Sequence, residues 1–162
     1  MNLDHIQSPD ICVAVITVST TRTTETDVSG NVICSLLSEA GLRISQRIIV
    51  SDRIDRIQDA LQNALLDSNC IIFCGGTGLT RDDCTIEAVS PFIEKRIDGF
   101  GEIFRWRSYQ EIGTPAILSR ALGGIIDKKA VFCIPGSPDA ARLAVRSIIL
   151  PEIAHILTHA GR

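Results

Sequence analysis

Aromatic residues are scarce in this chain of 162 residues: they make up 4% of it, against 45% for all hydrophobic residues. A core must therefore be built mainly from isoleucine, leucine, valine and alanine. Long apolar runs are absent too, since none approaches the ~20 residues that span a bilayer. The N-terminus lacks the charged and apolar regions of a signal peptide. These absences predict a cytoplasmic chain with no membrane segment.

A strong charge imbalance and linker segments are also missing. The formal net charge is −3, which gives no general reason to expect nucleic-acid binding. No low-complexity or linker-like stretch divides the chain, and its length fits one domain. We therefore expect a single domain over residues 1–162, with its core between about residues 11 and 158.

Histidines are few, and the cysteines lack the spacing of a metal site. No Cys-x-x-Cys pair occurs and no cysteine has a histidine near it in sequence, which disfavours zinc or disulfide use for the six cysteines. Four of them lie in or beside predicted buried strands, where a free thiol behaves as a small hydrophobe: Cys12, Cys70, Cys74 and Cys133. His5 precedes the first predicted strand, and His155 and His159 suit a helix C-terminus better than a metal. A nucleophile activated by histidine therefore finds no support.

Apolar runs alternate with amphipathic stretches along the rest of the chain. The runs predict strands at Cys12–Val18, Arg43–Val50, Ile71–Phe73 and Ala130–Ile134. The amphipathic stretches predict helices at Asn31–Ala40 and Arg53–Asp67, within Glu87–Tyr109 with an interruption near Gly99 and Gly101, at Pro115–Leu122, and at Asp139–Thr158 with a kink or break near Pro151. This alternation predicts an α/β fold with three layers, α/β/α: a mostly parallel sheet with helices on both faces.

The most informative segment is the run Cys74-Gly75-Gly76-Thr77-Gly78-Leu79-Thr80-Arg81-Asp82-Asp83-Cys84-Thr85, which follows a predicted strand and precedes a predicted helix. Its three glycines remove side chains that would keep a ligand away from the backbone. They also permit the positive φ that lets successive N–H groups converge on an anion. Asp82 and Asp83 then place two carboxylates where a metal ion or a phosphate would sit. This layout is typical of a phosphate-handling site at the carboxyl edge of an α/β sheet.

Two known phosphate motifs can be excluded for this run. A P-loop requires Gly-x-x-x-x-Gly-Lys-Ser/Thr, and no lysine follows any glycine at that spacing. A dinucleotide fingerprint would continue Gly76-x-Gly78 with a glycine at the position of Arg81.

Polar segments follow four predicted strands at their carboxyl ends, where α/β sheets bind their ligands. They are Ser19–Asp27, Ser51-Asp52, Gly75–Thr85 and Pro135–Pro138. Asp52 and Asp83 can each cap the helix that follows, or can hold Mg²⁺ together with substrate phosphates, because one or two carboxylates are enough for that ion. Ser137 at the N-cap with Pro138 at N1 favours a helix start, whose N-terminus is open to an anion.

Five ordered motifs carry a resemblance to a known family. The motifs are Thr17-Val18-Ser19 with Asp27-x-Ser29-Gly30, Gly75-Gly76-Thr77-Gly78-Leu79-Thr80 with Asp83 and Thr85-x-Glu87-Ala88, Gly99-Phe100-Gly101-Glu102-x-Phe104-Arg105, Ser119-Arg120-Ala121, and Pro135-Gly136-Ser137-Pro138. They run in order from about residue 11 to residue 150. Together they resemble the signature of the MoaB/MogA family of molybdenum cofactor biosynthesis proteins, and the Glu111–Thr114 region looks closest to its MoaB branch.

The resemblance implies a molybdopterin-binding fold and a substrate, molybdopterin, which is a pterin with a dithiolene and a terminal phosphate. It implies that this phosphate is adenylylated by MgATP with release of pyrophosphate, in preparation for molybdate insertion. It also implies a homotrimer or homohexamer and a partner protein for molybdenum insertion.

The resemblance assigns roles to the matching residues as well. It implies backbone contacts to phosphate from Gly75, Gly76, Thr77 and Gly78, catalysis and Mg²⁺ binding by Asp83 with Asp52 as the second carboxylate, a phosphate site at Pro135, Gly136 and Ser137, and polar contacts from Ser19 and Ser119.

Two segments depart from the family pattern. The family usually reads Pro-Arg-Asp-Val-Thr-Pro where this chain has Arg81-Asp82-Asp83-Cys84-Thr85-Ile86, and it often has an aspartate where Thr20 stands. A negative charge at Asp82 would lower affinity for a polyphosphate unless magnesium intervenes or Arg81 substitutes for the missing arginine. Two alternatives to an adenylyltransferase therefore stay open: a protein that binds molybdopterin without turnover, and a structural or partner protein of the same pathway.

Overall fold

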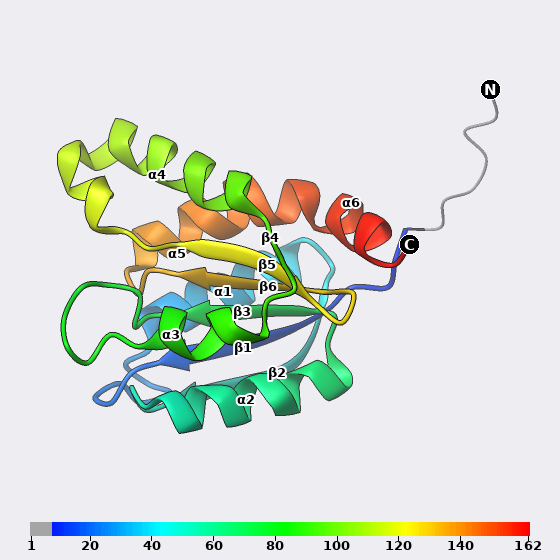
Figure 1. Ribbon diagram of the computed structural model, residues 1–162, viewed down its shortest axis with the longest axis horizontal. Helices are drawn as coiled ribbons and strands as arrows, with labels where there is room; N and C mark the ends of the chain where they lie inside the picture. Colours follow the sequence, from blue (N-terminus) through cyan, green and yellow to red (C-terminus); the bar gives the residue numbers. More distant parts are fainter. Residues whose placement is uncertain (1–7) are drawn as a thin grey trace.

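A six-stranded sheet runs through the centre of the computed structural model, which describes residues 8–162. Its strands lie in the order β2-β1-β3-β6-β5-β4 (Figure 1). Their bounds are Cys12–Val18 for β1, Arg43–Val50 for β2, Cys70–Cys74 for β3, Lys95–Arg96 for β4, Leu122–Ile126 for β5 and Lys129–Ile134 for β6. His5 and the N-terminal segment of the signal-peptide expectation lie outside the described residues.

Four neighbouring strands, β2, β1, β3 and β6, pair in parallel, whereas β5 and β4 join antiparallel. Every residue of β1 and β3 is buried. Their side chains alternate between two apolar clusters, so that Val13 and Val15 pack on one face and Ala14 and Ile16 on the other. The apolar sequence of β1 therefore reflects a strand covered on both faces, as predicted.

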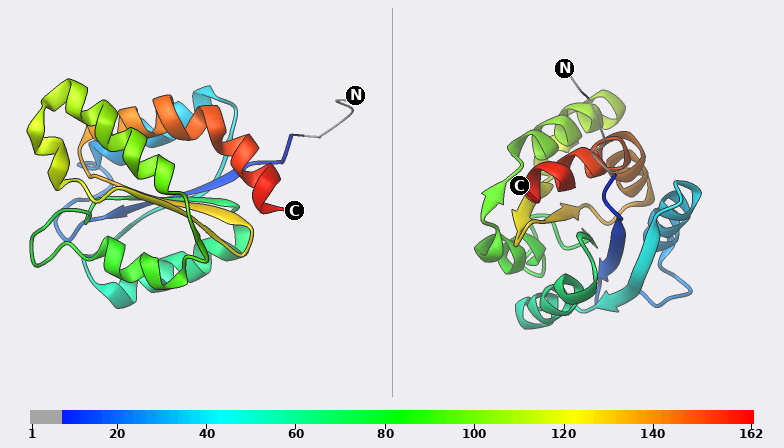
Figure 2. Two further views of the ribbon diagram at one scale, coloured as in Figure 1. Left: turned by 45° about the horizontal axis from the view of Figure 1, so that its top comes forward. Right: turned by 90° about the vertical axis from the view of Figure 1, so that its right-hand side faces the viewer.

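Helices form a layer on each side of the sheet, as the left view of Figure 2 shows. One layer contains α1 (Val28–Glu39), α4 (Asp98–Ile112), α5 (Pro138–Ala144) and α6 (Leu150–Ala160), and the other contains α2 (Ile54–Asp67) and α3 (Thr85–Val89). The predicted three-layer α/β/α fold with a mostly parallel sheet is confirmed. Within residues 8–162, no helix combines the length and the apolar character needed to cross a membrane.

The predictions missed β5 and β4 and placed a helix at Pro115–Leu122. The structure has a short 3-10 helix there, η2 (Thr114–Leu118), and a strand begins at Leu122. The strand was not predicted because it contains two glycines, and glycine normally weakens strands. They permit close packing here: a Cβ on Gly123 would lie 3.1 Å from Cβ of Phe100, and one on Gly124 would lie 2.6 Å from Cγ2 of Ile93.

The helical stretch predicted within Glu87–Tyr109 is interrupted, but earlier than at Gly99 and Gly101: α3 ends at Val89, β4 follows at Lys95–Arg96, and α4 begins at Asp98 and continues through both glycines. Gly101 has a packing reason, because a Cβ there would lie 2.6 Å from the carbonyl oxygen of Ala121. The helix therefore approaches the chain just before β5 more closely than any larger residue would allow.

The chain is not broken near Pro151, because residues 138–160 are helical throughout. A π-helical stretch, Val145–Ile149, separates α5 from α6. Pro151 then lies in the first turn of α6. A proline is tolerated in a first turn because the N–H that it lacks has no partner inside the helix there.

Candidate functional site

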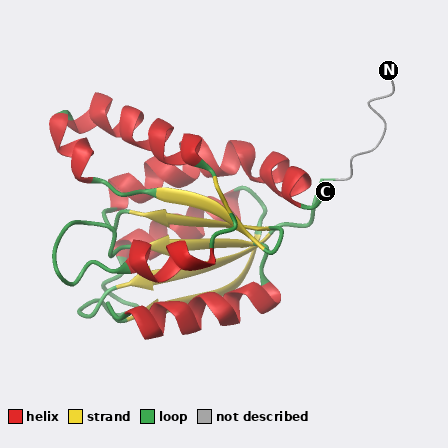
Figure 3. Ribbon diagram, in the orientation of Figure 1, coloured by secondary structure: helices red, strands yellow, loops and turns green. Residues whose placement is uncertain are grey.

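A cavity of about 630 Å³ lies at the carboxyl edge of the parallel strands. The loops on this side, where the strand arrows end, are drawn green in Figure 3. We call it the carboxyl-edge cavity. Its lining includes every predicted site residue except Asp52: Ser19, Gly75, Gly76, Thr77, Gly78, Asp83, Ser119, Pro135, Gly136 and Ser137. The sheet topology thus gathers four separate segments of the chain around one space.

The glycine loop, residues 75–78, has a backbone that only glycine accommodates at its first two positions. Gly75 has φ +107° and Gly76 has φ +67°. A Cβ on Gly75 would lie 2.5 Å from the carbonyl oxygen of Val18, and one on Gly76 would lie 2.3 Å from Oγ1 of Thr85. Both the positive φ and the close approach predicted for this run are therefore present.

Thr85 fixes the first half of this loop from the start of α3. Its buried hydroxyl donates to the carbonyl oxygen of Gly75 at 2.7 Å, and its N–H donates to the carbonyl oxygen of Gly76 at 3.0 Å. Because the two carbonyls are engaged on the side of α3, the loop is ordered by the protein itself before any ligand binds.

The two predicted catalytic carboxylates do not cap helices. Cys84 is the N-cap residue of α3 and Arg53 that of α2, with no side-chain cap bond at either helix. Oδ2 of Asp83 instead accepts from Thr80, from its N–H at 3.0 Å and its hydroxyl at 2.7 Å. The capping interpretation of both residues is wrong, which leaves their carboxylates available for other partners.

Asp52 lies close to the glycine loop although it is outside the cavity lining. Its Oδ2 accepts from the hydroxyl of Thr20 at 2.9 Å. Its Oδ1 would lie 3.4 Å from a Cβ on Gly76, and Oδ1 of Asp83 would lie 3.6 Å from a Cβ on Gly78. Neither Oδ1 accepts a hydrogen bond from residues 8–162. Each carboxylate therefore presents one free oxygen beside the loop.

The thiol of Cys84 lies among these acidic groups. Burial raises its pKa, and the negative charges of Asp52, Glu87, Asp83 and Asp82 raise it further. The thiol therefore stays protonated at neutral pH and is a poor nucleophile.

Three serines in the lining share one hydrogen-bonding arrangement. Each side-chain oxygen accepts from a nearby backbone N–H: from Thr21 and Arg22 to Ser19 at 3.3 and 3.1 Å, from Ala121 to Ser119 at 3.3 Å, and from Ala140 to Ser137 at 3.2 Å. Since the oxygen is already used as an acceptor, the hydroxyl hydrogen is left to donate to a ligand. The predicted N-cap role of Ser137 is confirmed.

Asp27 and Ser29 lie outside the lining but hold segments next to it in place, a role that was not predicted from the sequence. Asp27 is fully buried, caps α1 by accepting from the N–H of Gly30 at 3.0 Å, and accepts from the hydroxyl of Thr17 at 2.7 Å. The hydroxyl of Ser29 donates to the carbonyl oxygen of Gly136 at 2.6 Å. The Asp27-x-Ser29-Gly30 motif is therefore an N-cap motif that also holds the loop before α5.

The sequence analysis did not assign the opposite wall of the cavity either. This wall is mostly apolar and comes from α4 and the segment after it: Phe104, Ser108, Ile112, Pro115, Ala116 and Leu118. Arg22 adds a positively charged side chain to the lining. A cavity with one apolar wall and a few convergent polar groups is typical of a small-molecule site.

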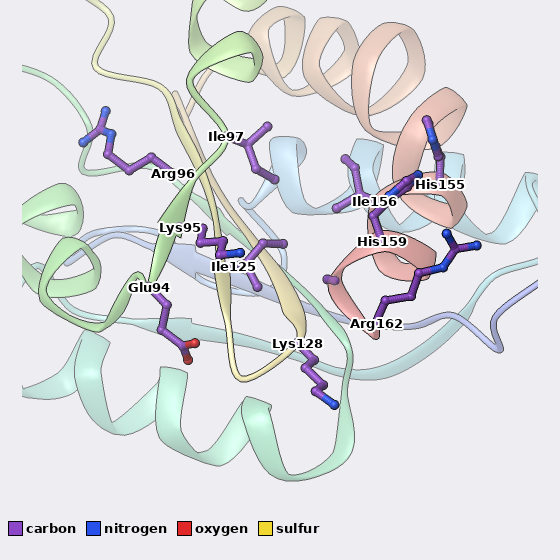
Figure 4. Close-up of a pocket in the computed structure, with 11 residues that line it drawn as sticks. Glu94, Lys95, Arg96, Ile97, Ile125, Lys128, His155, Ile156, His159 and Arg162 are labelled. Atoms are coloured by element: carbon purple, nitrogen blue, oxygen red, sulfur yellow. The ribbon is translucent and has the colours of Figure 1, made fainter.

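A second cavity, of about 580 Å³, lies at the opposite end of the sheet beside the hairpin that joins β5 to β6 (Figure 4). We call it the hairpin cavity. Long basic and apolar side chains dominate its lining: Glu94, Lys95, Arg96, Ile97, Ile125, Lys128, His155, Ile156, His159, Ala160 and Arg162. The rings of His155 and His159 meet edge to face with centroids 4.6 Å apart near the C-terminus of α6, as their spacing suggests.

Comparison with known proteins gives consistent matches. The family model described as "Probable molybdopterin binding domain" matches residues 14–155. "Molybdenum cofactor biosynthesis protein B" of Bacillus cereus is 48% identical over 145 residues, which cover 88% of this chain and 86% of the relative. The protein of that name from Bacillus subtilis is 46% identical over 155 residues, 93% of this chain and 91% of the relative.

Solved structures agree. A crystal structure of a molybdenum cofactor biosynthesis protein B superposes with a TM-score of 0.91 at 45% identity, over 96% of this chain and 99% of the other. The tungsten cofactor synthesizing protein MoaB from Pyrococcus furiosus superposes with a TM-score of 0.85 at 36% identity, over 94% of this chain and 98% of the other.

Proposed function

The chain belongs to the family of molybdopterin binding domains and has a role in molybdenum cofactor biosynthesis, and we propose that it adenylylates the terminal phosphate of molybdopterin with MgATP in the carboxyl-edge cavity. The family resemblance drawn from the sequence motifs is thereby confirmed.

The observation that carries the proposal is the convergence of hydrogen-bond donors on one cavity. The glycine loop brings its backbone to the lining, and the hydroxyls of Ser19, Ser119 and Ser137 are left to donate. Ser137 is also the N-cap of α5, which begins at Pro138, and helix N-termini favour anions. Donors from several elements suit a ligand with several phosphate oxygens, and the apolar wall suits a flat heterocycle.

The proposed reaction needs no nucleophile from the protein. An oxygen of the terminal phosphate of molybdopterin attacks the α-phosphorus of ATP, the bond to the β-phosphate breaks, and pyrophosphate leaves. Catalysis of such a transfer consists mainly of positioning and charge neutralisation. The protonated Cys84 fits this scheme, because the site then has no thiolate to compete with the phosphate.

The two carboxylates fit Mg²⁺. Asp83 and Asp52 offer hard oxygen ligands, and each has one free oxygen beside the glycine loop. Across residues 8–162 no three or more His, Cys, Asp or Glu side chains gather as a metal site. Magnesium is commonly held by one or two carboxylates with substrate phosphates, and it would neutralise charge on the polyphosphate.

Pyrophosphate release tests the proposal directly. Purified protein is given molybdopterin, ATP and Mg²⁺, and pyrophosphate is measured over time. Asp83→Asn keeps an oxygen that can accept from Thr80 but removes the charge. We expect it to lower the rate by about 10²-fold or more, as loss of a key electrostatic group commonly does. Asp59→Asn is the control, an exposed carboxylate on α2 outside the lining, and should keep the rate within a few-fold.

The outcomes separate the three functional hypotheses. Pyrophosphate release that depends on Asp83 supports the adenylyltransferase. Saturable molybdopterin binding without release, unchanged by Asp83→Asn, would favour a binding protein, the alternative to which the departures at Asp82 and Thr20 point. Absence of both binding and release would leave a structural or partner role in the pathway.

We also propose that the chain assembles into a homotrimer or homohexamer through α4 and η2, and hands its product to a molybdenum-insertion partner. Large apolar side chains are exposed on these two elements: Ile103, Trp106, Tyr109, Ile112, Ile117 and Leu118. An exposed apolar patch of this kind marks an interaction surface. Analytical ultracentrifugation of the wild type and of Trp106→Glu tests the assembly, and a monomeric wild type would refute it.

A further inference from the structure

Arg120 makes contacts that tie three parts of the carboxyl-edge cavity together. Its Nε donates to the carbonyl oxygens of Thr77 at 3.3 Å and Gly78 at 3.0 Å, and its Nη2 donates to that of Gly78 at 2.8 Å. The other side of the guanidinium forms an ion pair with Glu87 of α3. Arg120 itself follows Ser119, a lining residue. The arginine thus connects the glycine loop, α3 and the chain before β5.

These bonds complete a pattern that Thr85 begins. Thr85 engages the carbonyls of Gly75 and Gly76, and Arg120 engages those of Thr77 and Gly78. Four successive carbonyl oxygens are therefore bound by protein donors. In a trans peptide the carbonyl of one residue points opposite to the N–H of the next, and residues 8–162 contain no cis peptide.

The bound carbonyls fix the direction of the N–H groups in the same peptide planes. Because the carbonyls of residues 75–78 point toward Thr85 and Arg120, the N–H groups of residues 76–79 point away from these two residues. None of these N–H groups donates to an acceptor among residues 8–162. Successive N–H groups without internal partners form an anion-binding concavity when their orientation is fixed.

We propose that Arg120, held by Glu87, is a positioning residue that fixes the peptide planes of the glycine loop so that their N–H groups bind phosphate. The inference deepens the proposed function, on which it rests for the identity of the phosphate. Arg120 itself acts from behind the loop and does not touch the ligand.

The contacts of Arg120 require a guanidinium group. Arginine presents several N–H donors in a rigid planar fork, which here contacts the carbonyls of Thr77 and Gly78 and the carboxylate of Glu87 at once. A lysine ammonium retains the charge but lacks that fork. Arg120→Lys therefore distinguishes an effect of the positive charge from an effect of the hydrogen bonds that position the loop.

Backbone NMR of ¹⁵N-labelled protein titrated with inorganic phosphate tests the inference. In the wild type, we expect the amide protons of Gly76, Thr77 and Gly78 to move downfield on saturation. Arg120→Ala and Arg120→Lys should both weaken phosphate binding by about tenfold or more, the effect of losing hydrogen bonds to a charged ligand. Both should also lose the downfield shift of these three amides.

Controls separate positioning from a general loss of structure. Arg96→Ala removes an exposed ion pair with Asp98 outside the site and should leave phosphate binding unchanged. Millimolar guanidinium chloride should restore binding to Arg120→Ala, whereas equal sodium chloride should not. Glu87→Gln, which keeps an acceptor for the guanidinium, should weaken binding less than Arg120→Ala and serves if the latter does not fold.

The possible failures point to different conclusions. Unchanged phosphate affinity and unchanged amide shifts in Arg120→Ala, or in Glu87→Gln and Arg120→Lys together, would overturn the positioning role. Full binding by Arg120→Lys would overturn the requirement for the fork. If phosphate binds as expected in all variants but the wild type releases no pyrophosphate, the adenylylation proposal fails while the role of Arg120 stands.

Discussion

The two cavities have similar volumes, about 630 Å³ and about 580 Å³, but they are built in different ways. The carboxyl-edge cavity is lined by glycines, serines and backbone that the protein orders through short hydrogen bonds. The hairpin cavity is lined by long side chains, and those of Lys95, Lys128 and Arg162 lie in exposed positions (Figure 4). Volume and positive charge alone would not favour the first cavity over the second.

The difference lies in preorganisation. A donor fixed by the fold loses little conformational entropy when it binds a ligand, whereas an exposed lysine or arginine loses side-chain freedom. In the carboxyl-edge cavity Thr85 fixes the glycine loop and Ser29 fixes the loop at Gly136. The comparison therefore predicts that variants at the first cavity change phosphate binding strongly and variants at the second do not.

The largest expected effect comes from Gly76→Ala, compared with Gly41→Ala. Both glycines have positive φ, +67° and +74°, so both variants incur about 1–2 kcal/mol of backbone strain. At Gly76 the new Cβ would also lie 2.3 Å from Oγ1 of Thr85, whereas at Gly41 it meets nothing within 4 Å. We expect Gly76→Ala to lose about 3 kcal/mol of unfolding free energy, because it disrupts a buried hydrogen bond as well.

Urea unfolding measures both variants, and isothermal titration with phosphate measures the site. Gly76→Ala should abolish measurable phosphate binding, and Gly41→Ala should retain it. Equal losses of stability in the two variants would show that the approach of Thr85 to the loop is not tight.

An intermediate effect is expected from Ser137→Ala, compared with Lys128→Gln. Removing the Ser137 hydroxyl takes away one donor to the ligand, and we expect phosphate affinity to fall about tenfold. The helix cap is lost too, at a cost of about 1 kcal/mol. Lys128→Gln removes a positive charge from the hairpin cavity and should leave phosphate affinity unchanged. A larger loss from Lys128→Gln than from Ser137→Ala would reverse the order of the two cavities.

The parts of the site that sequence predicts well are local in the chain. The glycine run, Asp83 and the Ser137-Pro138 helix start each depend on residues a few positions apart, and each lies at the cavity as expected. The strand Cys12–Val18 was predicted with the bounds that the structure has, because a strand buried on both faces is an unbroken apolar run.

The parts that were missed depend on contacts between distant residues. Arg120 reaches Gly78 across 42 positions, and no spacing rule connects them. No strand was predicted at the glycines of β5, because their packing against Phe100 and Ile93 is not visible in the local sequence. Capping was one of two roles predicted for Asp52 and Asp83; Asp52 instead accepts from the distant Thr20, and Asp83 accepts from Thr80, three residues before it.

The smallest expected effect is a change in unfolding free energy at acid pH, which depends on the ion pair between Glu87 and Arg120 beside the carboxyl-edge cavity. The hydrogen bond from Arg120 lowers the pKa of Glu87 below that of an ordinary glutamate. A lowered pKa in the folded state means that the ion pair contributes stability above the unfolded pKa, about 4.3, and that this contribution is lost as pH falls through the folded pKa. Both partners are partly exposed, so the contribution is at most about 1 kcal/mol.

The measurement is the difference in unfolding free energy between wild type and Arg120→Ala, followed from pH 6 toward acid. We expect this difference to shrink as Glu87 becomes protonated, because the variant has no ion pair left to lose. The difference between wild type and Lys128→Gln should show no such step at the pKa of Glu87, since Lys128 belongs to the hairpin cavity. A constant difference for Arg120→Ala would mean that the carbonyl bonds, and not Glu87, account for what Arg120 adds to stability, and Glu87→Gln should then leave phosphate binding intact.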